Sequence, residues 1–525
     1  MKTFHNIAGH KPRRSVFENS YYKVMDVNLC EIIPVMCDLF LPGDLVKISA
    51  EALVRAMPMV APIMHRIDLK VDYYACPIRP MWPKPDYKDR NGDSLGYTQD
   101  VSSWEEFITG GVTGKLEPVQ PKWNPQNTDV YSYWDYFGNP LDSTNVGFEP
   151  NAWQIRALNF VYNEYFRDQN FEDPVDLDDE TIKIRKMEKD YFTSALQELQ
   201  RGTAPSVPFV GNLPIRAEGM DYTFGVIGGL IEGTTNTIGS LRTTPAQQIP
   251  IGNTGNQNTV EIPKLYADLS ESVSFDVNDM RYIFAIQRHM ERSMRAGSRL
   301  TEHVLAHWGV HNGDARLQRP EYIGGIRSPV IVSEVLQTSS TDGTSPQGNL
   351  AGHGIATSQT RVGTYYCKEH MVIIGLLSLM PKPVYQQGIN RQWLYETRFD
   401  YPTPELVNLG EQEIFNCELV STSDETWNRG IFGYQGRYDE HRVKQNQIVG
   451  RLRSTAPVSL EHWHLGRNFD YNALPALNKE FLEYKDDQRY SAYKGNKGWL
   501  ITYGNRIRRV APLPIVGTPG RIDHN

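Results

Sequence analysis

The chain has 525 residues, and its 54 Lys and Arg against 62 Asp and Glu give a formal net charge of −8. This mild acidity excludes a protein whose whole surface coats nucleic acid, because such surfaces are strongly basic. Hydrophobic residues make up 40% of the chain and charged residues 22%, which is typical of a globular protein and too apolar for general disorder. By length alone, roughly three or four domains would be expected.

Residues 1–24 are predicted to form a basic N-terminal arm. Lysines and arginines, among them Lys11, Arg13 and Arg14, outnumber the single acid, Glu18. Such an arm either frays in solvent or touches a polyanion or a neighbouring subunit. It lacks the apolar core of a secretory signal, and the longest apolar run of the chain, residues 371–380, is too short to span a membrane.

Strands are predicted to follow the arm. Residues 32–40 form an apolar run, and residues 67–73 alternate apolar and charged side chains with the period of a sheet buried on one face. Between them, residues 41–44 (LPGD) predict a tight turn, because Pro42 fixes φ and Gly43 accepts a left-handed conformation.

Three helices are predicted as local insertions. A capping box at residues 103–106 begins a short helix that ends at two glycines. Apolar residues repeat at helical spacing from 155 to about 168, and again from 278 to 295. The acid-rich stretch 161–180 is predicted to be a solvated surface loop. The buried stripe of the last helix is predicted to comprise Ile283, Ile286, Met290 and Met294.

Residues 203–262 differ from the sequence around them, since they are rich in Gly, Thr and Pro and hold only six charged residues. A segment of this length without a regular pattern is uncommon inside a compact domain and is usually functional or disordered. We therefore interpret it as an excursion inserted into the main body.

Strands resume in the last third of the chain. Residues 372–379 predict a buried strand, and further strand-like pieces lie at 448–452 and 499–503. The chain shows neither a repeat of solenoid length nor a regular alternation of strands and helices. Early and late strands must therefore pair across a large gap, which predicts a double-sheet sandwich with expanded connections.

Catalytic and metal-binding patterns are weak. The spacing of His303, His307 and His311 is that of helical zinc ligands, but the accompanying glutamate is absent and glycines interrupt the helix, so a structural role is favoured. Neither a nucleophile elbow nor a phosphate-binding glycine loop is present. Five thinly spread cysteines indicate reduced thiols rather than a disulfide framework. The sequence thus predicts no catalytic residue, metal or cofactor.

A basic, aromatic segment lies near the C-terminus. Its tyrosines and its Trp499 are interleaved with cations, a pattern that suits stacking on unpaired bases while the cations follow phosphates. A twisted edge strand with inward aromatics gives the same pattern, and the pattern alone favours that interpretation. The candidate DNA contacts here are Arg489, Lys494, Lys497, Arg506, Arg508 and Arg509, together with Lys11, Arg13 and Arg14 of the arm.

Long, specific phrases are spread along the chain. They include residues 34–48 (PVMCDLFLPGDLVKI), 162–170 (YNEYFRDQN), 295–325 (RAGSRLTEHVLAHWGVHNGDARLQRPEYIGG) and 517–524 (GTPGRIDH). In this order they resemble the major capsid protein of Microviridae, particularly of the gokushovirus branch. Residues 438–442 depart from the commoner family form.

The resemblance implies a mainly β fold, an eight-stranded antiparallel jelly roll with long loop and helical insertions, formed as a single domain by residues 25–525. It implies a sixty-copy T=1 shell around circular single-stranded DNA in the virion, assembled in the bacterial cytoplasm with a small basic DNA-condensing protein and minor virion proteins. Residues 203–262 would form the variable threefold protrusion that contacts a host receptor. The candidate host-contact residues are Thr223, Gly228, Gly229, Thr234, Thr235 and Asn236.

Two other functions remain open at this point. The many Tyr and Trp residues and scattered carboxylates would also suit a carbohydrate-binding or glycoside-cleaving β-sandwich. A non-viral module that binds single-stranded DNA is the third possibility.

Overall fold

The computed structural model describes residues 13–81, 121–141, 149–202, 215–217, 265–267, 277–295, 306, 319–336, 350–407, 409–493, 495 and 497–515. Contacts along the chain divide it into two units. The first comprises Met1–Arg201 and Arg292–Asn525, and the second comprises Gly202–Glu291.

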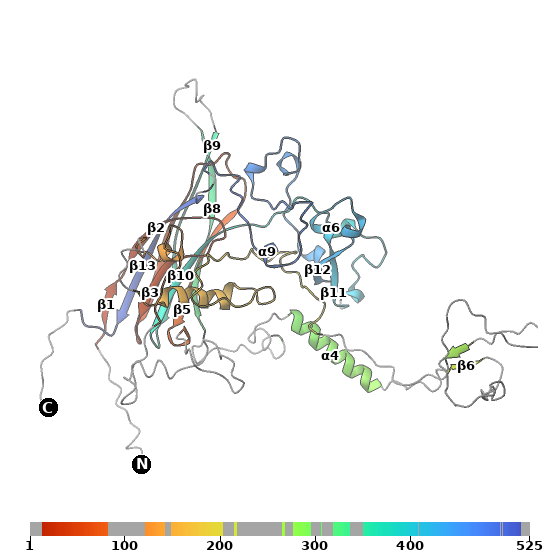
Figure 1. Ribbon diagram of the computed structural model, residues 1–525, viewed down its shortest axis with the longest axis horizontal. Coiled ribbons are helices and arrows are strands. Elements are labelled where there is room, and N and C mark those ends of the chain that lie inside the picture. The colour runs from red at the N-terminus through yellow and green to blue at the C-terminus, as the bar shows by residue number, and fades with distance from the viewer. Residues whose placement is uncertain are drawn as a thin grey trace, which may run out of the picture. The chain divides into compact units, whose positions relative to one another are not determined.

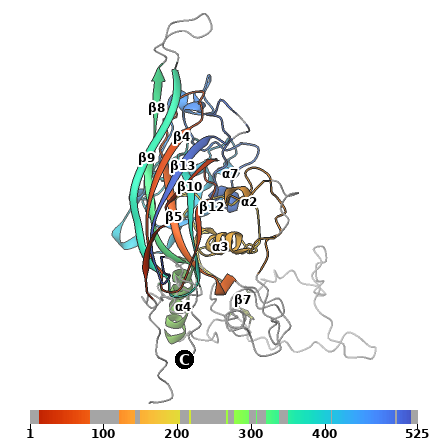
Figure 2. The ribbon, with the colours of Figure 1, turned by 90° about the vertical axis from the view of Figure 1, so that its left-hand side faces the viewer.

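Nine antiparallel strands of the first unit form two layers (Figures 1 and 2). The layer that we call the β13 sheet contains β1 (Ser15–Glu18), β2 (Tyr21–Val27), β13 (Trp499–Ala511), β4 (Leu45–Ala56) and β9 (Leu350–Tyr366). The layer that we call the β10 sheet contains β3 (Ile33–Phe40), β10 (Met371–Pro381), β5 (Ile67–Pro77) and β8 (Glu321–Leu336). The two are continuous through β8, because its first part pairs with β5 and its last residues, 331–336, pair with β9.

The strand pairing is nested along the chain. Without β1, the eight strands pair first with last, as β2 with β13, then β3 with β10, β4 with β9 and β5 with β8. Val27 thus lies opposite Trp499, and Phe40 opposite Met371. The prediction that early and late strands pair across a large gap is confirmed.

The predicted turn between β3 and β4 is also confirmed. The amide of Asp44 donates to the carbonyl of Leu41 at 3.1 Å, and the Asp44 carboxylate accepts from the Leu41 amide at 2.8 Å. Gly43 takes a φ of 90°, which is the left-handed conformation that this turn needs at its third position. The turn therefore fixes where the chain crosses from the β10 sheet to the β13 sheet.

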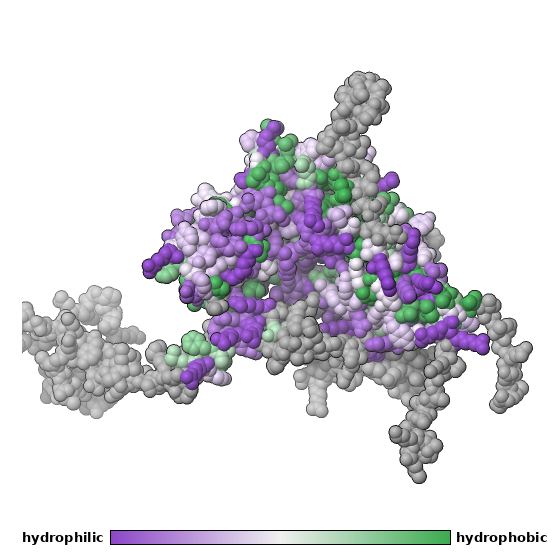
Figure 3. All heavy atoms as spheres, turned by 180° about the vertical axis from the view of Figure 1, so that it is seen from behind, coloured by the Kyte–Doolittle hydropathy of each residue, from purple (hydrophilic) through white to green (hydrophobic). Residues whose placement is uncertain are grey.

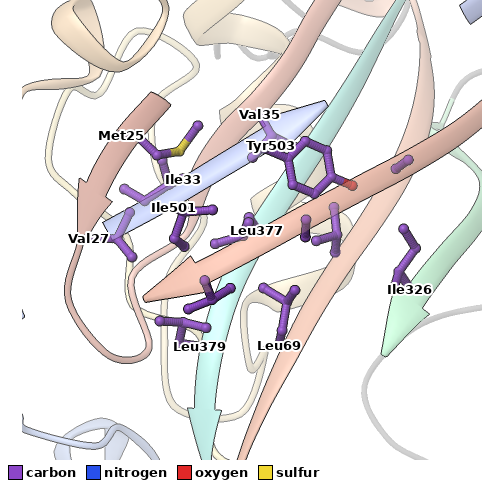
Figure 4. Packing of buried hydrophobic residues seen from close by; sticks show 14 of the residues in the cluster. Met25, Val27, Ile33, Val35, Leu69, Ile326, Leu377, Leu379, Ile501 and Tyr503 are labelled. Atoms are coloured by element: carbon purple, nitrogen blue, oxygen red, sulfur yellow. The ribbon is translucent and has the colours of Figure 1, made fainter. Parts of the chain in front are cut away.

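The main hydrophobic core fills the space between the two sheets (Figure 4). Met25 and Ile501 of the β13 sheet and Leu69 and Leu377 of the β10 sheet are among its buried residues. One buried polar link crosses the same space, in which the hydroxyl of Tyr73 lies 2.8 Å from that of Tyr503.

Helices cover the outer face of the β10 sheet (Figure 2). The helix α3 (Trp153–Val161) continues as a π-helical turn, η4 (Tyr162–Phe166), and packs with α2 (Tyr133–Tyr136) in a second hydrophobic cluster that includes Ile374 of β10. Because β10 is covered on both faces, every residue of the strand is buried. The predicted buried strand at 372–379 and the predicted helix from 155 are thus confirmed.

A third hydrophobic cluster forms a lobe that we call the third lobe, built mainly from the region after β10 together with Tyr191, Phe192 and Ala195. Its hairpin pairs β11 (Glu411–Phe415) with β12 (Ile431–Gly436). The short helices are α6 (Asn416–Leu419), α7 (Glu425–Asn428), α8 (Asp439–Arg442) and α9 (Lys479–Leu482), with 3-10 turns η1 (Arg79–Met81), η6 (Arg391–Trp393), η7 (Pro404–Leu406), η8 (Gly450–Leu452) and η9 (Glu461–Trp463).

Three predictions differ from the structure. The expected arm is strand from residue 15, since β1 and β2 both pair with β13. The acid-rich stretch 161–180 is anchored rather than freely solvated, because Asp178 binds the buried Arg156 at 2.6 Å. The strand expected at 448–452 is a 3-10 turn, since Gly450 takes a left-handed φ of 68° that a strand cannot contain.

The second unit contains the two-stranded pair β6 (Ile215–Ala217) and β7 (Leu265–Ala267) and most of α4 (Val277–Arg295). The helix predicted at 278–295 is confirmed, and within its predicted stripe Met294 is buried while Ile283, Ile286 and Met290 are half-buried. The predicted helix at 103–110 and all of the 203–262 excursion except β6 lie outside the described residues. The helices that the structure describes are each too short or too polar to cross a bilayer.

Candidate nucleic-acid interface

Among the described residues, no helix covers the outer face of the β13 sheet (Figure 2). Alternation along each strand decides which side chains lie there. On β4, Val46 and Ile48 are buried while Lys47 is exposed, and on β13, Ile507 is buried while Arg506 is exposed. The face is therefore made of the polar positions of strands whose other positions build the core.

Cations lie side by side across three strands of this face. Arg508 of β13 lies opposite Lys47 of β4. Two residues along, Ser49 of β4 lies between two arginines, with Arg506 of β13 opposite it on one side and Arg361 of β9 opposite it on the other. Opposed like charges on antiparallel strands are destabilising. An anionic partner would remove this repulsion.

Some of these cations have acidic partners and others do not. Arg506 pairs with Glu51, and Arg508 lies 4.0 Å from Glu18. For Lys47, Arg55 and Arg361, the described part of the chain offers no acid within ion-pair distance. These three exposed side chains are the ones most available to a polyanion.

Exposed aromatic and aliphatic side chains adjoin the cations. Tyr22 of β2 is 74% exposed and lies opposite Gly504 of β13, with Val24 exposed on the same strand. A base could stack on the Tyr22 ring while the neighbouring arginines contact phosphates. At the end of the sheet, the guanidinium of Arg14 lies 5.8 Å from the ring centre of Tyr366.

The structure divides the predicted DNA-contacting residues into two groups. Arg13, Arg14, Arg506 and Arg508 are exposed. Three other candidates have partners inside the protein, which makes them less available to DNA: Lys497 binds Glu31 at 2.6 Å, Arg509 binds Asp44 at 2.6 Å, and Arg489 donates to the Gly466 carbonyl at 2.6 Å.

The aromatic residues of the C-terminal segment follow the alternative interpretation in part. Trp499 and Tyr503 of β13 are buried, as a strand with inward aromatics requires, but β13 pairs with β4 on one side and with β1 and β2 on the other, so it is not an edge strand. Tyr490 is buried outside any strand, while Tyr493 is exposed. Lys11, Lys494, the histidine triplet at 303–311 and the candidate host-contact residues lie outside the described residues. Thr223, Gly228, Gly229, Thr234, Thr235 and Asn236 are those host-contact residues.

Lys47, Arg55, Arg361 and Tyr22 were missed by motif reasoning. The alternation of residues 46–56 marks Lys47 and Arg55 as outward positions, so that signal was present in the sequence. The position of Arg361 beside them follows only from the pairing of β4 with β9.

Other site chemistry is sparse in the described part of the chain. No group of three or more His, Cys, Asp or Glu side chains there could hold a metal ion. All five cysteines are free, and burial raises the pKa of the Cys37 thiol to about 12, so this thiol stays protonated.

Comparison with known proteins gives consistent relatives over the whole chain. The family model described as "Capsid protein (F protein)" matches residues 5–521. The chain is 31% identical to capsid protein VP1 of Chlamydia phage 1, over 97% of this chain and 96% of the relative. It is 31% identical to VP1 of Bdellovibrio phage phiMH2K over 92% and 90%, and 30% identical to VP1 of Spiroplasma virus 4 over 98% and 97%.

Proposed function

The chain belongs to the capsid protein (F protein) family, and we propose that sixty copies of it close a T=1 icosahedral shell around a circular single-stranded DNA genome. The full-length match to microvirus capsid proteins carries this conclusion. The protein is a structural component of a bacteriophage virion and not an enzyme, so the glycoside-cleaving alternative is set aside.

The eight nested strands are best explained as a jelly roll. In that fold a long antiparallel hairpin is rolled up, which pairs the first strand with the last and gives two four-stranded sheets. The pairs β2·β13, β3·β10, β4·β9 and β5·β8 follow this rule, with β1 as an added strand. The helices and the third lobe are then insertions that enlarge the subunit for contacts with its neighbours.

Exposed aromatic residues of the third lobe support contacts between copies. Trp393 is 74% exposed, and Phe399, Tyr401 and Leu409 are also exposed nearby in the sequence. Aromatic residues dominate the energy of protein interfaces. Hydrophobic patches lie among hydrophilic residues on the side of the molecule seen in Figure 3, as expected for a subunit with several neighbours.

The outer face of the β13 sheet is proposed to face the genome. Lys47, Arg55 and Arg361, for which the described residues offer no acidic partner, release counterions when they bind phosphates. A few such contacts in each subunit are multiplied over the shell. A net charge of −8 is compatible with this role, because the cations are gathered on one face.

The genome contact can be tested through its salt dependence. In the double variant Lys47→Gln and Arg361→Gln, the slope of log affinity for oligo(dT) against log salt should fall by about 1.4, since each phosphate contact to a single strand contributes about 0.7. The control carries Arg442→Gln and Arg451→Gln, which are exposed cations outside the β13 sheet. An unchanged slope in the first variant would remove this face from the genome contact.

Residues 203–262 are proposed to form the host-contacting protrusion at the threefold axis. Two features support this: the segment belongs to a unit separate from the main body, and it carries few charges. Virions with residues 205–260 deleted should assemble but lose adsorption to host cells. Normal adsorption would contradict the assignment. The small basic DNA-condensing protein, minor virion proteins and a host receptor are proposed as the remaining partners.

A further inference from the structure

A buried carboxylate at one end of the β10 sheet has three cationic partners. Asp68 is 1% exposed and lies 3.1 Å from Nε of Arg66, 2.6 Å from Nη2 of Arg327 and 3.5 Å from Nζ of Lys382. The two arginine side chains are at least half exposed, so both keep N–H groups that face solvent.

A second carboxylate shares these cations. Glu188 binds Lys70 at 2.5 Å, Arg327 at 2.8 Å and also Lys382. Four cations thus share two carboxylates, which leaves two positive charges in excess. The nearby Arg185 does not change this balance, because it is paired with Asp72 at 2.7 Å.

A cavity of about 610 Å³ adjoins this cluster, and Arg66 and Lys382 are among the residues that line it. Its volume lies within the roughly 300–1,000 Å³ that is typical of small-ligand sites. Its lining also includes apolar side chains, among them Met64, Val449 and Trp463. Met64 and Val449 are both exposed, so this apolar surface is open to a ligand.

The two histidines of the cavity add little charge. Burial lowers the pKa of His65 to about 4, and it also lowers the pKa of His464. Both imidazoles are therefore neutral at neutral pH. The positive charge of the cavity lining therefore comes from Arg66 and Lys382.

We propose that this cavity binds one unpaired nucleotide of the packaged strand, with its phosphate on Arg66 and Lys382 and its base against Trp463. This arrangement matches both kinds of lining residue, because the phosphate balances part of the excess charge and the base covers exposed apolar surface. The inference rests on the proposed function, since it requires single-stranded DNA as the partner. It adds a base-binding site distinct from the phosphate contacts of the β13 sheet.

The test uses the full-length chain and a fluorescent oligo(dT) of about ten nucleotides, with affinity measured by anisotropy. Trp463→Leu should weaken binding about ten-fold, since stacking on one aromatic ring accounts for a factor of roughly 5 to 160. Arg66→Gln should also weaken binding about ten-fold, because it removes a cation that contacts the phosphate. The matched controls are Tyr471→Leu, an exposed aromatic residue that does not line the cavity, and Arg451→Gln, an exposed arginine that does not line it either. In Arg66→Gln, Asp68 keeps two cationic partners, which protects the fold.

Two results support the proposal: ultraviolet crosslinks from the oligonucleotide to the Trp463 peptide, and weak competition by inorganic phosphate. Equal affinities for Trp463→Leu and Tyr471→Leu would overturn it. Displacement by inorganic phosphate at the same concentration as the oligonucleotide would also overturn it, because the site would then recognise free phosphate alone. If the Lys47 and Arg361 double variant loses affinity while Trp463→Leu does not, the cavity assignment fails and the proposed function stands.

Discussion

The polar link inside the sandwich should have a measurable effect on stability. Tyr73 of β5 is fully buried, lies 2.8 Å from the hydroxyl of Tyr503 and donates to Oδ1 of Asn505 at 2.9 Å. The amide of Asn505 in turn donates to the carbonyl of Val35 on β3 at 2.9 Å. One chain of hydrogen bonds therefore joins the β10 sheet to the β13 sheet.

Tyr73→Phe removes two of these hydrogen bonds without changing the shape of the core. Each buried hydrogen bond contributes about 0.5–1.5 kcal/mol, and a partner left without a replacement costs about 1–3 kcal/mol. We therefore expect the opening free energy of β13 to fall by about 2–4 kcal/mol. Hydrogen exchange of the β13 amides in the unassembled full-length chain measures this value strand by strand.

The control for this prediction is Tyr22→Phe, which removes an exposed hydroxyl from the same sheet and should change the opening free energy by less than about 0.5 kcal/mol. If the β13 amides exchange as slowly in Tyr73→Phe as they do in Tyr22→Phe, the link does not hold the two sheets together. The double variant Tyr73→Phe and Asn505→Leu removes both partners of one hydrogen bond. Its loss of opening free energy should be smaller than the sum of the losses in the two single variants.

Three further predictions concern single residues. Gly375→Ala should lower the thermal midpoint of unfolding, because a Cβ there would lie 2.8 Å from the ring of Tyr73, and an unchanged midpoint would refute the close approach. Asp44→Asn should destabilise the chain by about 3–5 kcal/mol in urea unfolding, because it leaves the largely buried Arg509 without its anion, and a change below about 1 kcal/mol would contradict that role. Burial alone would raise the pKa of Asp68, but its hydrogen bonds from arginine hold that pKa below the ordinary value of about 4, so its contribution is present above about pH 4 and is lost as pH falls further. The stability difference between the native chain and Asp68→Asn should therefore shrink below about pH 4, and a constant difference would contradict the ion pairing.

Local chemistry in the sequence was sufficient for several elements of the fold. The turn at Leu41–Asp44 was predictable because Pro42 and Gly43 restrict the backbone in a way that few other residue pairs can. The strand around Ile374 was predictable because a continuous apolar run indicates burial on both faces. In both cases the decisive information lies within a few consecutive residues.

Contacts between distant residues could not be predicted in this way. Lys497 looked like a surface cation, yet its partner Glu31 is 466 residues away in the sequence. The acidic stretch looked solvated because nothing local shows that Asp178 meets the buried Arg156 of α3. The approach of Arg361 to the β4 cations on the candidate interface could not be predicted for the same reason, since it arises from the pairing of β4 with β9, in which Arg361 lies opposite Ser49.

The most direct test of the account is a cryo-electron microscopy reconstruction of particles assembled from this chain. The account predicts closed shells of uniform diameter with sixty copies, in which the outer face of the β13 sheet is turned toward density for DNA. Particles of another symmetry, or shells in which Lys47 and Arg361 lie on the exterior, would contradict it.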